Sequence, residues 1–171
     1  YNAISADSGS QILAITNSSF SDNYSEKTGG ALSTTSTINT ISAIFENNTA
    51  VSSGGAIYCG VLTSGGTVGN ITSIENSQFN SNTSGMGGAI YLYNANIKSI
   101  TDTVFNNNTA DSQGGALFNA DGTIGTIKAN FTNNSSGEIG GVILNTGTID
   151  KIINSTFENN TATTTGGAIF I

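Results

Sequence analysis

The chain has 171 residues, of which 36% are apolar and only 9% are charged, and its formal net charge is −7. Its four cations are the lysines Lys27, Lys98, Lys128 and Lys151, and it contains no arginine and no histidine. Nucleic acids and anionic membrane surfaces are therefore set aside as partners, because binding to them requires clustered cations. The lack of histidine also removes the commonest general base and metal ligand of enzyme sites.

One motif occurs six times and sets the organisation of the chain. Phe-x-x-Asn is found at Phe20/Asn23, Phe45/Asn48, Phe79/Asn82, Phe105/Asn108, Phe131/Asn134 and Phe157/Asn160. A Gly-Gly pair follows each copy and is itself followed by Ala, or once by Val142, and then by Ile or Leu. Ile-x-x-Ile precedes each Phe, and consecutive Phe residues lie 25, 34, 26, 26 and 26 positions apart.

Each repeat predicts three short strands in chain order: the Ile-x-x-Ile segment, the residues up to Phe, and the Ala-Ile-Tyr segment. The Asn, Gly, Ser and Thr residues between them are expected to form turns. The segments are too short for helices, and the Gly-Gly pairs and β-branched residues also argue against helix. The sequence therefore predicts an all-β fold, a single-stranded parallel β-helix (solenoid) of about six coils of about 26 residues, in which each coil pairs only with its neighbours. Residues 1–171 are expected to form a single such segment of a longer repeat protein, or one that stacks end to end with other copies.

The repeated side chains are expected to form ladders through the coils. The six Phe residues would stack in a narrow core, where offset ring pairs add to apolar burial. The six Asn residues would pass amide hydrogen bonds from coil to coil and so satisfy a buried turn. The residue two before each Phe is always small, which suits a tight inward corner. Which residues of Ala-Ile-Tyr point inward stays open, because strict alternation is broken in these short coils.

Variation in coil length falls between the Ala-Ile-Tyr strand and Ile-x-x-Ile. This connection is longer at 2–11 and longest at 59–70. Binding residues often lie in such insertions, and neutral drift in a surface loop is the alternative. The candidate binding loop comprises Cys59, Gly60, Val61, Leu62, Thr63 and Ser64. Cys59 is the only cysteine, so we expect a half-buried structural thiol and no internal disulfide.

The paired Phe-x-x-Asn and Gly-Gly-Ala-Ile/Leu motifs resemble the passenger domains of bacterial autotransporter adhesins. The polymorphic outer-membrane proteins of chlamydiae are the best-known users of both motifs, and the resemblance covers essentially the whole chain. It implies a right-handed β-helix that is exported to the cell surface and anchored to the outer membrane in the full-length protein. It also implies a role as an adhesive rod or stalk, with host-cell or cell-surface proteins or glycans as partners.

A non-enzymatic surface adhesin, stalk or structural scaffold is the expected function, with no catalytic residues and no cofactor. The main alternative is a protein that binds or degrades polysaccharide, since β-helices often carry such lyases and hydrolases. Hydrolysis would need two facing carboxylates. Glu46 and Glu158 share the position after Phe, but they lie four coils apart, or about 19 Å at β-strand spacing.

Two further interpretations are weaker. A flat ice-binding or lattice-forming surface would use the partial ladder of Thr49, Thr83, Thr109 and Thr161, but hydrogen bonding within a turn explains these residues as well. Calcium could be held by Asp22 or Asp121, yet neither lies in a dense acidic loop, so no metal site is expected.

Overall fold

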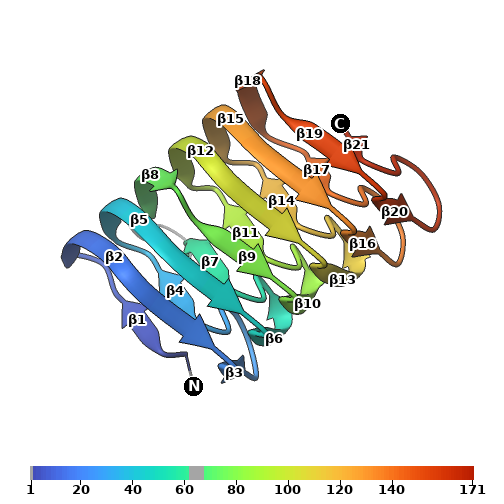
Figure 1. The fold of residues 1–171 in the computed structure, drawn as a ribbon. Helices are drawn as coiled ribbons and strands as arrows, with labels where there is room; N and C mark the ends of the chain where they lie inside the picture. Colours follow the sequence, from blue (N-terminus) through green and yellow to red (C-terminus); the bar gives the residue numbers. More distant parts are fainter. Residues whose placement is uncertain (1, 62–67) are drawn as a thin grey trace.

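The computed structural model describes residues 2–61 and 68–171 of the chain. These residues form a solenoid in which the strands of successive coils lie side by side in three parallel sheets (Figure 1). No helix occurs in the described residues. The prediction of an all-β parallel β-helix of about six coils is confirmed. The coils are numbered 1 to 6 in the order of their Phe residues, from Phe20 to Phe157.

The sheet that carries these residues, called the Phe sheet, lies at the front of Figure 1. Its strands are β2 (Gln11–Ser21), β5 (Thr37–Glu46), β8 (Asn70–Glu75), β9 (Gln78–Asn80), β12 (Asn96–Asn106), β15 (Thr123–Thr132), β18 (Thr148–Ile152) and β19 (Thr156–Glu158). In most coils Ile-x-x-Ile and the residues up to Phe belong to one long strand, rather than to the two strands predicted. Both Ile residues of coil 2, Ile38 and Ile41, are fully buried and pair with their counterparts in the next coil.

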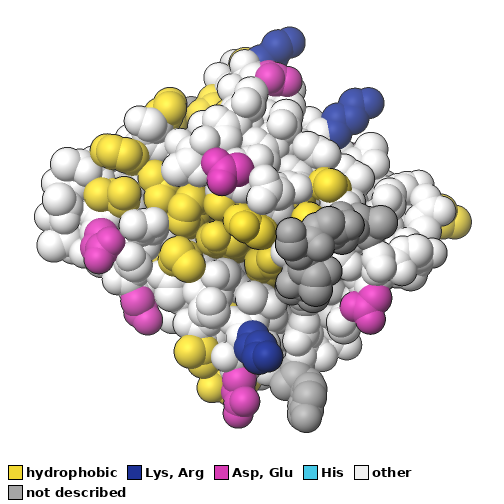
Figure 2. All heavy atoms as spheres, turned by 180° about the vertical axis from the view of Figure 1, so that it is seen from behind, with side chains coloured by type: hydrophobic (Ala, Val, Ile, Leu, Met, Phe, Trp, Pro, Cys, Tyr) yellow, Lys and Arg dark blue, Asp and Glu magenta, His cyan; other side chains and the backbone are white. Residues whose placement is uncertain are grey.

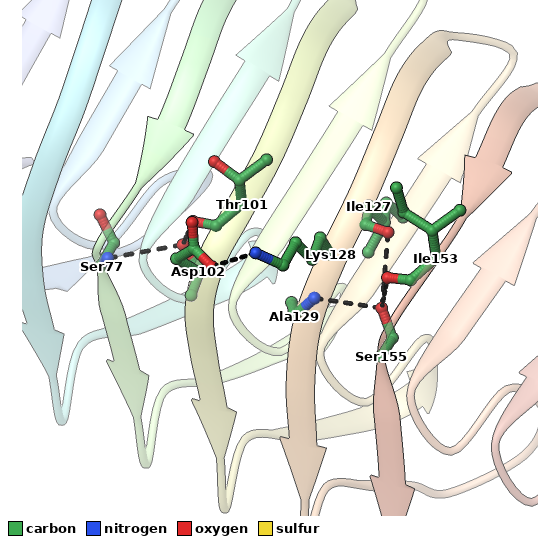
Figure 3. A network of polar contacts seen from close by, with 9 residues as sticks. Ser77, Thr101, Asp102, Ile127, Lys128, Ala129, Ile153 and Ser155 are labelled. Atoms are coloured by element: carbon green, nitrogen blue, oxygen red, sulfur yellow. Dashed lines mark hydrogen bonds and ion pairs between the residues drawn. The ribbon is translucent and has the colours of Figure 1, made fainter.

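A β-bulge explains how this strand keeps both apolar segments inward. In coils 1, 3, 4 and 6 one extra residue adopts the left-handed region, for example Asp102 at φ 49°. The hydroxyl that follows bridges the bulge by donating to the carbonyl two positions back, as Ser155 Oγ does to Ile153 O at 3.0 Å. Coil 5 lacks the extra residue, and there Ser155 Oγ accepts the backbone N–H of Ala129 at 3.1 Å (Figure 3). The small residue two positions before Phe therefore lies along the Phe sheet and not at a corner: it follows the bulge in coils 1, 3, 4 and 6 and pairs across from it in coils 2 and 5.

The second sheet, called the Thr sheet, occupies a segment that the sequence indicated as a turn. Its strands are β3 (Tyr24–Ser25), β6 (Thr49–Ser53), β10 (Thr83–Met86), β13 (Thr109–Gln113), β16 (Ser135–Ser136) and β20 (Thr161–Ala162). In β6, β10 and β13 the first residue is a half-exposed Thr, whereas the small residue after it faces inward: Ala50, Ser84 and Ala110 are all buried. These strands are short and largely polar, which is why apolar patterning did not reveal them.

The third sheet, called the Ala-Ile sheet, lies behind the Phe sheet in Figure 1. Its strands are β1 (Ile4–Ala6), β4 (Leu32–Thr34), β7 (Ile57–Gly60), β11 (Ile90–Tyr93), β14 (Leu117–Ala120), β17 (Ile143–Asn145) and β21 (Ile169–Phe170). Ala56 and Ile57 both face the core, because their two N–H groups share one acceptor, the carbonyl of Ala89, at 2.9 Å. This shared acceptor breaks the alternation of side chains, so consecutive residues point inward.

Each Gly-Gly pair joins the Thr sheet to the Ala-Ile sheet, and its two glycines serve different purposes. The first adopts the left-handed region, as Gly87 does at φ 63°. The second is required by packing between coils: a Cβ on Gly88 would lie 2.0 Å from the carbonyl oxygen of Gly115. Adjacent coils therefore touch backbone to backbone at this turn, where no side chain fits.

Candidate functional site

Six asparagines form a continuous amide ladder at the turn between the Phe sheet and the Thr sheet. In a typical step, Asn82 donates from its backbone N–H and from Nδ2 to Oδ1 of Asn108, both at 3.0 Å. Asn108 in turn donates to Oδ1 of Asn134 at 3.0 Å and to the backbone carbonyl of Phe79 at 2.9 Å. Side-chain amides bond in this way in all five steps, at 2.8–3.0 Å. The predicted Asn ladder is confirmed, and its members in coils 2 to 5 are fully buried.

The two end members of the ladder, Asn23 and Asn160, differ from the other four in burial. Asn23 donates from Nδ2 to Oδ1 of Asn48 at 2.8 Å and from its backbone N–H to the same oxygen at 3.1 Å, yet it is only half-buried. Asn160 is also half-buried, although its Nδ2 donates to the carbonyl of Phe131 at 3.0 Å. All six residues therefore take part in the predicted ladder, and the turn is fully buried only in coils 2 to 5. Asn23 and Asn160 each lie in a terminal coil of the described solenoid, where a neighbouring coil covers the turn on one side only.

The six Phe rings form a second column inside the solenoid, next to the amide ladder. Neighbouring ring centroids are 4.8–5.1 Å apart, and their planes are within 14° of parallel. This separation is close to the spacing of paired strands, so the rings stack because the backbone stacks. Their burial makes the Phe and Asn columns elements of the scaffold, inaccessible to a ligand in coils 2 to 5.

Three residues of the candidate binding loop, Cys59, Gly60 and Val61, belong to the part of the chain that the structure describes. Cys59 and Gly60 belong to strand β7, and the Cys59 thiol is fully buried. Val61 accepts a hydrogen bond from Tyr58 Oη to its carbonyl at 3.2 Å. Leu62, Thr63 and Ser64 lie outside the described residues, so ligand binding by this loop stays a prediction. The expectation of a half-buried Cys59 is wrong, because alternation in β7 turns this side chain into the core.

Burial of Tyr58 and Cys59 should make the protein less stable at alkaline pH. Desolvation raises the pKa of the Cys59 thiol from 9.0 to about 12 and, with smaller contributions from Tyr91, Tyr93 and Cys59, raises the pKa of Tyr58 from 10.0 to about 12. Between about pH 9 and about pH 12 the unfolded chain therefore binds fewer protons than the folded one. The free energy of unfolding must fall as the pH rises through this window.

Urea denaturation across that range measures the effect. Cys59→Ala removes the buried thiol and leaves the Tyr58 phenol. The free energy of unfolding of this variant is expected to fall less steeply with pH than that of the parent chain. Val51→Ala, which removes an exposed side chain of the Thr sheet and no ionisable group, serves as the control and should leave the slope unchanged. An equal slope for Cys59→Ala and the parent chain would contradict the assignment.

The two glutamates that share the position after Phe do not lie next to each other. Glu46 and Glu158 lie in one column of the Phe sheet, separated by Asn80, Asn106 and Thr132 in the intervening coils. Within residues 2–61 and 68–171, no three His, Cys, Asp or Glu side chains gather as a metal ion would require. Lys128 Nζ and Asp102 Oδ1 form an ion pair at 2.7 Å on the surface of the Phe sheet, where Asp102 is the bulge residue of coil 4 (Figure 3). Such exposed pairs contribute about 0–1 kcal/mol, so this one adds little to stability.

An aromatic cluster on the outer side of the Ala-Ile sheet, in which Tyr93 is exposed and Tyr91 half-buried while Tyr58, Phe118 and Leu144 are buried, was not predicted from the sequence. We call Tyr58, Tyr91, Tyr93, Phe118 and Leu144 the outer aromatic cluster. The Tyr58 and Tyr91 rings stack at 5.8 Å, and Phe118 meets Tyr91 edge to face at 5.1 Å. Figure 2 shows apolar side chains gathered on this face of the molecule. The sequence does show a large residue after the Ile or Leu that follows most Gly-Gly pairs. It does not show whether the side chain of that residue points into the core or outward.

The stacked ladders and three parallel sheets define a repeat protein of the parallel β-solenoid class. The repeat of the Chlamydia polymorphic membrane proteins matches residues 17–35, 42–60, 76–93, 102–120 and 154–171, which together make up more than half of the chain. The chain therefore belongs to the Chlamydia polymorphic membrane protein repeat family. Coil 5 is not among the matched stretches, and it has Val142 where the other coils have Ala. Searches of curated proteins and of solved structures gave no match.

Membership of this family and the β-solenoid fold fit a surface-exposed, adhesin-like passenger domain. The family consists of non-enzymatic outer-membrane proteins. Membership of it implies that the protein to which this chain belongs is located at the outer-membrane surface. The described residues contain no helix that is long and apolar enough to cross a membrane.

Proposed function

We propose that this chain is a segment of a non-enzymatic adhesin or stalk, displayed outside the outer membrane and binding proteins or glycans of host cells or other cell surfaces. The observation that carries the proposal is the use made of the repeated motifs. The repeated motifs stack one coil on the next: the Phe rings and Asn amides form buried columns, and the Gly-Gly pairs allow the backbones of adjacent coils to touch. The repeat therefore extends a rod, and binding is left to the variable outer faces.

The proposed partners follow from charge as well as from family. A net charge of −7 disfavours nucleic acid and anionic lipid, whereas neutral or basic surfaces remain available. The surface is rich in uncharged Asn, Ser and Thr side chains, which can hydrogen-bond to proteins and glycans alike.

One experiment separates an adhesin from a polysaccharide-degrading enzyme. The purified chain is incubated with cultured host cells and with a glycan array, while the release of reducing sugar from the same glycans is measured. Saturable binding without release of sugar is the expected result. Turnover of any polysaccharide would overturn the proposal in favour of a lyase or hydrolase, and the absence of binding to every surface would leave a purely structural stalk.

A further inference from the structure

The outer aromatic cluster has one ring that stands clear of its neighbours. Tyr93 is 39% exposed, and the residues that pair with it in the adjacent coils are Gly60 and Ala120. Neither has a side chain larger than a methyl group, so no bulky neighbour in its column covers the Tyr93 ring. Its closest aromatic contact is Tyr91, at a centroid distance of 6.4 Å. Tyr93 therefore offers a ring face to a partner.

Apolar side chains extend from this ring along the solenoid. Phe118 and Leu144 occupy the next two coils in the Tyr91 column, and Met86 and Ile139 pack against them from the edge of the Thr sheet. The result is a strip of aromatic and aliphatic side chains over three coils (Figure 2). Phe118 and Leu144 are themselves buried, so the exposed part of this strip comes from Tyr93 and from the half-buried side chains of Tyr91, Met86 and Ile139. Exposed aromatic residues of this kind are common anchors of protein interfaces.

The charges around the strip are negative. Asp121 is exposed and follows directly after Ala120, and its carboxylate is close enough to help burial and Tyr93 raise the pKa of Tyr91. Glu138 is exposed at the opposite edge, where its Oε2 accepts hydrogen bonds from Ser112 and Gln113. The strands beneath the strip, β7, β11, β14 and β17, carry no lysine. A cation is thus attracted twice, by the ring face and by the carboxylates, whereas an anionic ligand is repelled.

We infer that this strip binds a protein segment in which a Lys or Arg side chain stands next to aliphatic or aromatic residues. The cation lies on the Tyr93 ring above Ala120 and beside Asp121. The apolar residues of the partner cover the half-buried side chains of Tyr91, Met86 and Ile139. This inference rests on the proposed function in one respect: it identifies the kind of partner that an adhesive rod of this design would take.

A random-peptide phage library, panned against the full chain, supplies the probe. Enriched peptides should contain Lys or Arg beside apolar residues, and their affinity is then measured by fluorescence anisotropy with synthetic copies. Tyr93→Ser and Asp121→Asn are each expected to weaken binding by about tenfold, as loss of a desolvated cation–π contact or of a paired charge would. Asp121 has φ 57°, and Asn tolerates this backbone as well as Asp does.

Matched controls lie on other faces. Tyr24→Ser removes an exposed tyrosine from the Thr sheet, and Asp7→Asn removes an exposed carboxylate near the first coil; neither should change the affinity. Equal binding by Tyr93→Ser and the parent chain, or enrichment of peptides without basic residues, would overturn the inference. The inference would also be overturned if a glycan bound to this face and bound equally well to the Asp121→Asn variant.

The two proposals fail separately. If the parent chain binds cells and Tyr93→Ser binds them equally well, the rod is adhesive but uses another surface. If the parent chain binds basic peptides but no cell or glycan, the strip is a protein-docking surface and the proposed role in adhesion is wrong.

Discussion

Replacing Gly88 with alanine is expected to disrupt the middle of the solenoid, with a loss of stability of roughly 4 kcal/mol or more. The new Cβ would lie 2.0 Å from the carbonyl oxygen of Gly115 and 2.7 Å from the backbone of Thr109. All these atoms belong to backbone that is held by hydrogen bonds, including Gly88 N–H to the Gly114 carbonyl at 3.0 Å. No flexible side chain can move to make room, so coils 3 and 4 must separate locally.

Gly167→Ala is the matched control, because this glycine occupies the same motif position in coil 6. A Cβ there would meet only the carbonyl oxygen of Asn160, at 3.8 Å, which is an ordinary contact. Urea denaturation followed by circular dichroism should show a large loss for Gly88→Ala and a change within about 1 kcal/mol for Gly167→Ala. Equal losses would show that contact between coils does not explain the requirement for glycine at position 88.

Replacing Asn108 with leucine is expected to cost about 3–6 kcal/mol, through buried polar groups that lose their partners. Asn82 would lose the acceptor of its backbone N–H and of one Nδ2 hydrogen, and Phe79 would lose the donor to its carbonyl. Other bonds survive: Asn82 Nδ2 still donates to the carbonyl of Phe45, and the backbone N–H of residue 108 still donates to Oδ1 of Asn134.

Asn80→Ala provides the comparison, since Asn80 lies on the outer side of the Phe sheet and, among the residues that the structure describes, its Nδ2 donates only to the side chain of Gln78. Its loss should change the free energy of unfolding by about 0.5 kcal/mol or less, as surface substitutions usually do. Thermal and urea unfolding of the three chains would measure both effects. A cost for Asn108→Leu as small as that for Asn80→Ala would mean that water replaces the amide ladder without loss.

The sequence predicted those features of the fold that repeat with identical chemistry. Phe45, Asn48 and Gly54 have counterparts in every coil, and stacking places such residues in columns whatever the details of the strands. The Thr sheet escaped prediction because strands such as Thr49–Ser53 are polar and show little apolar alternation. The two consecutive inward residues Ala56 and Ile57 were also out of reach, because a carbonyl shared by two N–H groups leaves no trace in composition.

The candidate surface was harder to predict than the scaffold. Tyr91 and Tyr93 were visible in the sequence, but their direction depends on where alternation resumes after the Gly-Gly turn. The position of Asp121 beside them depends on the turn that follows strand β14 and on pairing between coils. Variable side chains on an outer face follow no period, so their arrangement emerges only once the strands are in register.

The bulge in the Phe sheet has a consequence for how such genes can change. A coil with the extra residue and a coil without it place their Phe and Asn residues in the same columns. Where two such coils meet, a hydroxyl of the bulged coil accepts the backbone N–H that the bulge leaves without a carbonyl partner, as Ser77 Oγ does for Ala43 at 3.1 Å. Coils are therefore interchangeable units. Unequal recombination that duplicates or removes one whole coil would lengthen or shorten the rod by about 4.8 Å and leave both new junctions correctly paired. Reach from the cell surface can then be adjusted by copy number alone, while the outer faces diversify independently.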